Sequence, residues 1–214
     1  MNLNHFSEKV ANNEIIIDSL WYKECSAINI QYFFDQKEQL FFQSLQSNIL
    51  KKSGEPLLIC PPNSLHISIS FVLNVKETFQ NSKDQIWENI KDECLEELDF
   101  VAQTQAVIKV VFEKLIATDS AVIAIAPDIE AIQKLRRKIN KVEPIRKWGK
   151  NYSNIVHTTL FRYREKLNNP LRFQHILDEY RVNCHVTIPQ FDLVKELRYP
   201  SIETELIKSF SFRK

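Results

Sequence analysis

The clearest pattern in the chain is an alternation of apolar and polar side chains over residues 65–70. The sequence there reads Leu-His-Ile-Ser-Ile-Ser, and two prolines precede it at 61–62. Because successive side chains of a β-strand point to opposite faces, this pattern predicts a strand with one apolar face and one face that carries His66, Ser68 and Ser70. Solvent-facing strand positions more often hold Lys, Glu or Thr, so the polar face of this strand is a candidate for chemistry.

A second stretch, residues 155–162, repeats the arrangement. It reads Ile-Val-His-Thr-Thr-Leu-Phe-Arg, so His157 and Thr159 share one face of a predicted strand and Arg162 lies just beyond them. If the two strands face each other across a groove, two imidazoles and two hydroxyls surround one point.

The rest of the chain shows a mixture of helical and extended patterns. Residues 1–22 have no clear period and are expected to be irregular or partly helical. The other predicted elements are helices within 35–53, 84–98, 127–139 and 170–180, and strands within 28–34, 57–60, 105–115, 121–126, 182–193 and 205–212. Because strands and helices do not alternate strictly, we expect an α+β fold with antiparallel sheet flanked by helices.

Two segments are rich in basic residues. In the helix predicted within 127–139, the basic residues at 134 and 136–138 are interpreted as a solvated face, with the lining of an anion-binding groove as the alternative. Residues 143–154 are interpreted as an exposed polar connector. Their interleaved basic and aromatic side chains, Tyr152 among them, would alternatively stack a base and hold phosphate.

Composition is that of an ordinary soluble globular protein. We expect the 214 residues to form a single domain, with residues 1–54 as an N-terminal extension and helix packed on it. The net charge of +1 gives no global signature of DNA or membrane binding. No apolar run approaches the roughly 20 residues of a membrane span, and residues 1–18 lack the pattern of a signal peptide. We therefore expect a cytoplasmic protein without membrane contact, and a monomer.

Cysteine and glycine usage excludes several kinds of site. The four cysteines form no C-x-x-C pair, so we interpret them as reduced core thiols rather than as zinc ligands or a disulfide framework. Gly54 and Gly149 are the only glycines, which excludes a glycine-rich phosphate loop or a dinucleotide fingerprint. Any bound phosphate must be held mainly by side chains.

The two histidine runs carry the residue types that acid–base chemistry on a phosphodiester needs. One imidazole takes a proton from the attacking oxygen, and the other gives a proton to the leaving oxygen. Ser68 and Thr159 can hold the non-bridging phosphate oxygens, and Arg162 can add positive charge.

The tripeptide His-x-Ser/Thr is weak evidence by itself. It occurs four times, and at His5 and His185 we interpret it as accidental or structural, since Pro189 interrupts the strand that holds His185. Ordinary half-buried histidines stay open as an alternative for His66 and His157. A zinc site is disfavoured because no carboxylate or thiol completes a ligand set, and a Ser-His-Asp arrangement stays open although no G-x-S-x-G elbow is present.

The extended motifs resemble those of the two-histidine (2H) phosphoesterase superfamily, which includes 2′,5′-RNA ligase-like proteins and cyclic nucleotide phosphodiesterases. Residues 61–72 follow the pattern P-P-x-x-L-H-x-[ST]-h-x-F-h, and residues 157–162 meet H-x-T-L-x-R about 90 residues later. The resemblance covers about residues 55–165 well and the tail loosely. It implies a bilobal fold in which two antiparallel sheets surround a central groove.

The resemblance also implies a function. It implies metal-independent chemistry without a cofactor, at the 2′,3′-cyclic phosphate or 2′-linked phosphodiester of a nucleotide or RNA end. His66 and His157 would be the acid and the base, and Ser68 and Thr159 would bind phosphate.

The substrate side of the resemblance is weaker. Arg162 is a substrate-binding candidate, and Tyr152, Tyr163 or Tyr199 would stack the base. Ser68 stands where Thr is commoner in the family, and the segment before residue 61 is longer than in compact members. Two alternatives on the same fold are a non-catalytic nucleotide or RNA-end binding protein and an RNA 2′,5′-end ligase.

Overall fold

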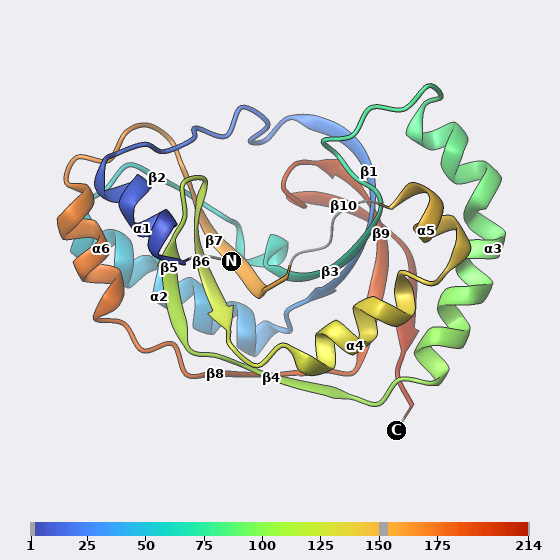
Figure 1. Cartoon of the computed structure of the whole chain (residues 1–214). Helices are drawn as coiled ribbons and strands as arrows, with labels where there is room; N and C mark the ends of the chain where they lie inside the picture. Colours follow the sequence, from blue (N-terminus) through green and yellow to red (C-terminus); the bar gives the residue numbers. More distant parts are fainter. Residues whose placement is uncertain (1–2, 150–153, 214) are drawn as a thin grey trace.

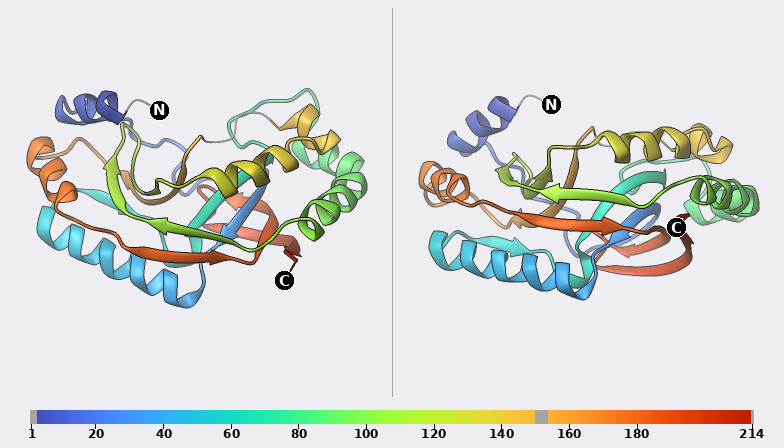
Figure 2. Two further views of the ribbon diagram at one scale, coloured as in Figure 1. Left: turned by 60° about the horizontal axis from the view of Figure 1, so that its bottom comes forward. Right: turned by 90° about the horizontal axis from the view of Figure 1, so that it is seen from below.

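The computed structural model describes the backbone of residues 3–149 and 154–213, and it contains two lobes side by side (Figure 1). Each lobe has a four-stranded antiparallel sheet with helices on its outer side, as the α+β prediction requires. A further two-stranded ladder runs along one side of both lobes (Figure 2). The fold class expected from the sequence is therefore confirmed.

The first lobe contains the first histidine strand at the edge of its sheet. The strand order is β10 (Glu203–Ser211), β9 (Gln190–Arg198), β1 (Glu24–Phe33) and β3 (His66–Leu73). The helices of this lobe are α3 (Lys83–Gln103), α4 (Glu130–Ile139) and α5 (Glu143–Trp148), and α4 and α5 contact β3. The segment expected to be an exposed connector therefore contains a helix that packs beside the histidine strand.

The second lobe contains the second histidine strand inside its sheet. The strand order is β2 (Leu57–Ile59), β7 (Val156–Tyr163), β6 (Ala121–Ala126) and β5 (Lys114–Ala117). The helices of this lobe are α1 (Leu3–Ala11), α2 (Gln36–Ser53) and α6 (Pro170–Asp178). The strands β3 and β7 contact each other where the two lobes meet.

Two strands predicted as single elements are each divided in the structure. The strand predicted over 105–115 becomes β4 (Ile108–Phe112) and β5, and the strand over 182–193 becomes β8 (Cys184–Ile188) and β9. Pro189 separates β8 from β9, as expected of a residue without a backbone N–H. β4 and β8 pair with each other to form the ladder along the lobes.

The N-terminal quarter is part of the fold rather than an extension on it. β1 lies between β9 and β3, where it hydrogen-bonds to both, and so it is an internal strand of the first sheet. α2 follows as the sequence signals predict: Asp35 and Glu38 form a capping box, and Gly54 ends the helix in the left-handed conformation.

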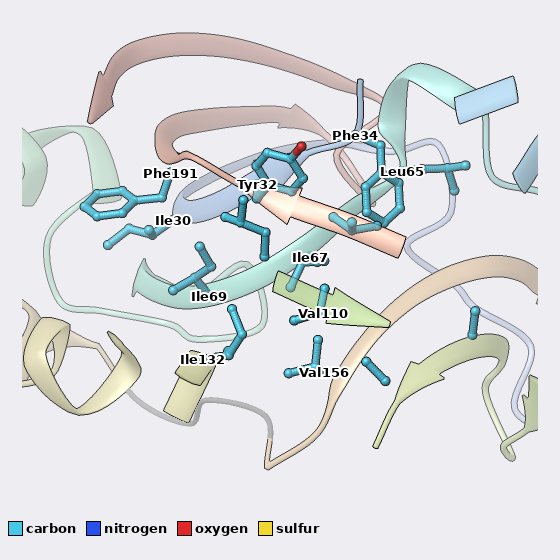
Figure 3. Close-up of a cluster of buried hydrophobic side chains, with 14 of the residues drawn as sticks. Ile30, Tyr32, Phe34, Leu65, Ile67, Ile69, Val110, Ile132, Val156 and Phe191 are labelled. Atoms are coloured by element: carbon cyan, nitrogen blue, oxygen red, sulfur yellow. The ribbon is translucent and has the colours of Figure 1, made fainter. Parts of the chain in front are cut away.

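One hydrophobic core underlies both histidine strands. Figure 3 shows Ile67 and Ile69 of β3 packed among side chains of β1, with Ile132 of α4 and Val156 of β7 close by. Because apolar residues beside each histidine lie in this shared core, packing fixes the two polar faces relative to each other. None of the described helices is long and apolar enough to span a membrane.

Candidate active site

His66 is held by the turn that precedes β3. A short 3₁₀ helix (Pro62–Ser64) leads into the strand, and His66 Nδ1 lies 2.7 Å from the Ser64 carbonyl oxygen. A carbonyl only accepts hydrogen bonds, so Nδ1 carries the hydrogen and the neutral ring has its lone pair on Nε2. Ser68 Oγ lies 3.1 Å from Nε2 and donates to it in that state. The His-x-Ser spacing thus aims the imidazole and the hydroxyl at the same point.

His157 and Thr159 take the corresponding positions on β7. Both are half-buried, while Val156, Thr158 and Leu160 between and beside them are buried. Among the described residues, His157 Nδ1 has no hydrogen-bond partner. The ring of His157 is therefore placed by strand geometry and packing rather than by a carbonyl.

Both histidine strands change register just after the His-x-Ser/Thr triplet. Opposite β3, consecutive residues of β1 pair with residues 68 and 70, so Ile69 has no direct partner on β1. On β7 the pairing with β6 likewise passes over Leu160. The alternation of faces shifts as a result, and the residues five positions after each histidine, Phe71 and Arg162, face the cavity. Ser70, expected on the polar face, is instead buried and donates to Asn140.

The two strands line one cavity of about 230 Å³. It brings together the predicted residues His66, Ser68, His157, Thr159, Arg162 and Tyr199. Its remaining walls are Asn29, Gln31, Phe71, Asn74, Val75, Lys76, Glu196, Pro200 and Ser201. The two histidine strands therefore do meet across a common space, although they lie in different sheets.

One of the predicted aromatic residues, Tyr163, does not line this cavity. Tyr163 is fully buried on the other face of β7, where its hydroxyl donates to the Thr118 carbonyl. Tyr152 lies outside the described residues. His185 is exposed on β8 and does not line the cavity, in keeping with a non-catalytic interpretation.

Arg162 is held at the cavity by groups from three segments. Its Nη2 donates to the Tyr199 hydroxyl at 3.3 Å, and its guanidinium lies over the Tyr199 ring at 5.9 Å. Nη1 donates to the Ser120 carbonyl at 3.4 Å, and Nε is 3.6 Å from the Asp18 carboxylate. The Arg162 charge is therefore fixed in place beside the histidines, with one anionic partner.

Burial keeps both imidazoles neutral. It lowers the pKa of His66 to about 4, a shift that the Ser64 carbonyl opposes and the Arg162 charge reinforces. Burial also lowers the pKa of His157 to about 4, and the nearby His66 ring adds to the shift. The charges of Arg136 and Arg162 act on the His157 pKa in the same direction. An anion bound between the rings would reverse these effects, because it favours the charged imidazolium.

Arg136 is a site residue that the sequence interpretation placed on a solvated helix face. In the structure it is only 1% exposed, and its guanidinium reaches from α4 to both histidine strands. It donates to the carbonyls of Ser68 (2.7 Å), Ile69 (3.1 Å) and Ile155 (3.0 Å). These contacts join the backbone of β3 to the residue that precedes β7, so Arg136 fixes the spacing of the two histidines.

The position of Arg136 in its helix contained a signal of its burial. It lies four residues after Ile132 and three before Ile139, which are both buried, and so it falls within the apolar stripe. Its neighbour Arg137 is exposed, as the interpretation required. A cation within an apolar stripe needs buried acceptors, and here backbone carbonyls provide them.

Metal-binding groups are not gathered anywhere in the described part of the chain. No cluster of three or more His, Cys, Asp or Glu side chains there is arranged to hold a metal ion. The donors at the cavity are imidazoles, hydroxyls, carboxamides, the Arg162 guanidinium and the Lys76 ammonium, a set suited to an anionic ligand such as phosphate.

Comparison with known proteins gives a result at the level of structure. No family model matches the sequence, and no curated protein matches it in sequence. TT0787 of Thermus thermophilus matches with a TM-score of 0.64 and 15% identity, over 87% of this chain and 98% of that chain. LigT of E. coli, in a crystal structure with 3′-AMP, matches with a TM-score of 0.62 and 11% identity, over 89% of this chain and 100% of that chain.

A third solved structure, described as a phosphoesterase, matches with a TM-score of 0.60 and 10% identity, over 88% of this chain and 99% of that chain. Almost the full length of each of these proteins is covered by this chain. The chain therefore shares its fold with TT0787, LigT and the solved phosphoesterase, in agreement with the bilobal fold that the resemblance of its two histidine motifs implies.

Proposed function

We propose that this chain is a metal-independent phosphodiesterase that acts on the 2′,3′-cyclic phosphate or the 2′-linked phosphodiester of a nucleotide or RNA end. The observation that carries the proposal is the cavity itself, where His66 and His157 meet with a hydroxyl two residues beyond each. Two imidazoles, two hydroxyls and one guanidinium match the needs of an in-line displacement at phosphorus.

The reaction follows from these groups. One neutral imidazole removes a proton from water or a ribose hydroxyl as its oxygen attacks phosphorus, and the other, as imidazolium, protonates the leaving oxygen. Ser68 and Thr159 donate to the non-bridging oxygens, and Arg162 offsets the charge that builds up on them. The hydroxyl of Ser68 turns from His66 Nε2 to the phosphate when the substrate binds.

We infer the roles of the two rings from their surroundings. The Ser64 carbonyl accepts from His66 Nδ1 and so favours the charged form of that ring. For His157, in contrast, every cause other than burial is a nearby ring or cation that disfavours charge. When the phosphate supplies negative charge, His66 takes up the proton first, so His66 is the general acid and His157 the general base.

Similarity to LigT supports a nucleotide substrate. That protein has been crystallised with 3′-AMP and with ATP, and its fold matches nearly the whole of this chain. The cavity here has a size and polarity suited to part of a nucleotide, with Phe71 and Tyr199 as its aromatic walls.

The first prediction concerns the two histidines. With chelator present, the protein should hydrolyse at least one member of a panel of 2′,3′-cyclic nucleotides, 2′,5′-oligoadenylates and RNA with a cyclic phosphate end. His66→Ala or His157→Ala should each lower kcat about 10²–10⁴-fold, because each removes one proton-transfer partner. His185→Ala, which changes an exposed histidine in the same kind of triplet, should keep full activity.

The roles of the two histidines can be separated with a p-nitrophenyl 2′-phosphodiester of a nucleoside. Because p-nitrophenolate leaves without protonation, His66→Ala should lose much less activity on this substrate than His157→Ala. Full activity in both alanine variants would contradict the proposal. Nucleotide binding without turnover of any panel member would identify a binding protein on the same fold.

A further inference from the structure

The cavity has a second polar wall beside the histidines. It is formed by Asn29 and Gln31 of β1, Glu196 of β9, and Ser201 just after β9. Asn29 and Glu196 are each 3% exposed, and the other two are similarly buried. Polar side chains are rarely buried to this degree without a structural or ligand-binding role.

Hydrogen bonds within this wall fix the orientation of Asn29. The Glu196 carboxylate accepts from Asn29 Nδ2 at 2.9 Å and from the Ser201 backbone N–H at 2.5 Å. Gln31 Nε2 donates to Ser201 Oγ at 2.9 Å. Because a carboxylate oxygen accepts only from the NH₂ side of the carboxamide, the other side, Oδ1, must point away from Glu196.

Asn29 Oδ1 is buried and has no hydrogen-bond partner among the described residues. A buried acceptor in this state is unfavourable unless something donates to it. Gln46 Oε1 is also buried without a partner, so an unpaired oxygen alone is not evidence of a ligand. Asn29 differs because it lines the cavity that contains the histidines, whereas Gln46 does not.

The second polar wall lies beside Ser68, one of the two hydroxyl residues proposed to bind phosphate. Gln31 pairs with Ser68 across β1 and β3, and Asn29 is two residues further along β1. Two residues of a strand span roughly 6.8 Å, so a ligand held at Ser68 reaches Asn29 with the part next to its phosphate. Glu196 lines the same wall and accepts a hydrogen bond from Asn29, and its carboxylate disfavours a second phosphate there.

We propose that this wall is a nucleoside subsite in which Asn29 Oδ1 accepts a hydrogen bond from a neutral N–H or O–H donor of the substrate. The inference rests on the proposed function, since it takes the phosphate to lie at Ser68 and Thr159. Two parts of a nucleotide carry such donors: the exocyclic amino group of adenine or cytosine, and a ribose hydroxyl. Glu196 is a positioning residue, because it acts by orienting the Asn29 carboxamide.

Calorimetric binding of product nucleotides tests the subsite without requiring turnover. The base arm compares 3′-AMP with purine riboside 3′-phosphate, and 3′-CMP with pyrimidin-2-one riboside 3′-phosphate, since hydrogen replaces the amino group in each second ligand. The ribose arm compares 3′-AMP with 5′-deoxyadenosine 3′-phosphate. We expect about tenfold weaker binding when the donor is removed in one arm, because Oδ1 is then buried unpaired.

Variants of the wall complete the test. Asn29→Leu should abolish the difference in affinity between the two ligands of the responsive arm. Glu196→Gln should reduce this difference, because the amide of Gln can also donate a hydrogen bond, which allows the Asn29 carboxamide to adopt the flipped orientation. Gln46→Leu removes a comparably buried amide outside the cavity and should keep the full difference, which controls for loss of stability.

Three results would overturn the inference. The first is equal binding within both arms by the wild-type protein, and the second is an unchanged difference in Asn29→Leu. Absence of binding by every nucleotide would also overturn it. These results are independent of the proposed hydrolysis, which the His66→Ala and His157→Ala variants test by turnover.

Discussion

At the scale of single residues, both imidazoles of the site are neutral in the free protein. The negative charge of a bound phosphate is what favours protonation of one of them. With the pKa of both rings at about 4, almost all of the free protein at pH 7 has both histidines uncharged. In the productive form, one ring is a charged imidazolium and the other ring is neutral. Its population in the free protein therefore falls about tenfold for each pH unit above roughly 5, whereas a bound phosphate anion raises the pKa of the pair and extends that population to higher pH.

This difference predicts two separate pH profiles. Since kcat/KM reports the free protein and kcat reports the complex, kcat/KM should be highest in mild acid and decline toward pH 7, while kcat should decline at higher pH. Steady-state rates on a 2′,3′-cyclic nucleotide between pH 4 and 9 measure both. Coincident profiles, or a kcat/KM that rises from pH 5 to 8, would show that these histidines do not share the catalytic proton.

At the scale of secondary-structure elements, Arg136 connects α4 to both histidine strands. Arg136→Met should lower the free energy of unfolding by about 2–4 kcal/mol, because three buried or partly buried carbonyls lose their donors. It should also lower kcat/KM, because the spacing of the two histidines is then less firmly fixed. Urea denaturation and steady-state kinetics measure the two effects.

The neighbouring arginine provides a matched control for this prediction. Arg137→Met changes an exposed residue of the same helix and should alter stability by no more than about 0.5 kcal/mol. Equal losses of stability in the two variants would contradict the role assigned to Arg136.

Elements whose signals are local could be predicted from the sequence, and those that depend on distant contacts could not. The capping box at Asp35 and Glu38 lies within four residues, and α2 begins as it predicts. The sequence does not predict helix α5, because the position of this helix depends on a contact with a distant strand. Gly149, which follows the helix, packs tightly against Phe71 of β3. A Cβ at that glycine would lie 2.4 Å from the Phe71 carbonyl oxygen.

The candidate site divides in the same way. His66 and Ser68 follow from strand alternation, and the register shift at Ile69 then brings Phe71 to the cavity in place of Ser70. Alternation in Ile-Asn-Ile-Gln-Tyr (28–32) does indicate a polar face on β1, but only the sheet order shows that this face lies beside Ser68. Pairing partners are long-range information that a local pattern does not contain.

At the scale of the whole molecule, residues 12–23 form a strap that runs from α1 of the second lobe to β1 of the first lobe (Figure 1). On the second lobe, the Ile16 N–H donates to the Asp119 carbonyl, and on the first lobe the Tyr22 N–H donates to the Tyr199 carbonyl. Between these anchors, the Asp18 carboxylate lies beside Arg162. The strap therefore sets how much of the Arg162 charge is available to a substrate.

Removal of that carboxylate should strengthen substrate binding at the expense of stability. Asp18→Asn leaves Arg162 without its anionic partner, so KM for an anionic substrate should fall about two- to fivefold, while the free energy of unfolding falls by about 1 kcal/mol. Asp119→Asn serves as the control. It breaks the ion pair between Asp119 and Lys9, near the point where the strap is anchored to the second lobe, and should leave KM unchanged. A higher KM in Asp18→Asn would show that the carboxylate serves only to place Arg162.

The edge position of β3 gives Arg136 a consequence beyond catalysis. An edge strand presents unpaired backbone groups that can recruit a strand from another copy of the chain, and β3 is the last strand of its sheet. Arg136 occupies the Ser68 and Ile69 carbonyls. The side chain that spaces the histidines thus also occupies two hydrogen-bond acceptors of the edge strand, so we expect Arg136→Met to show more concentration-dependent self-association than Arg137→Met in sedimentation velocity.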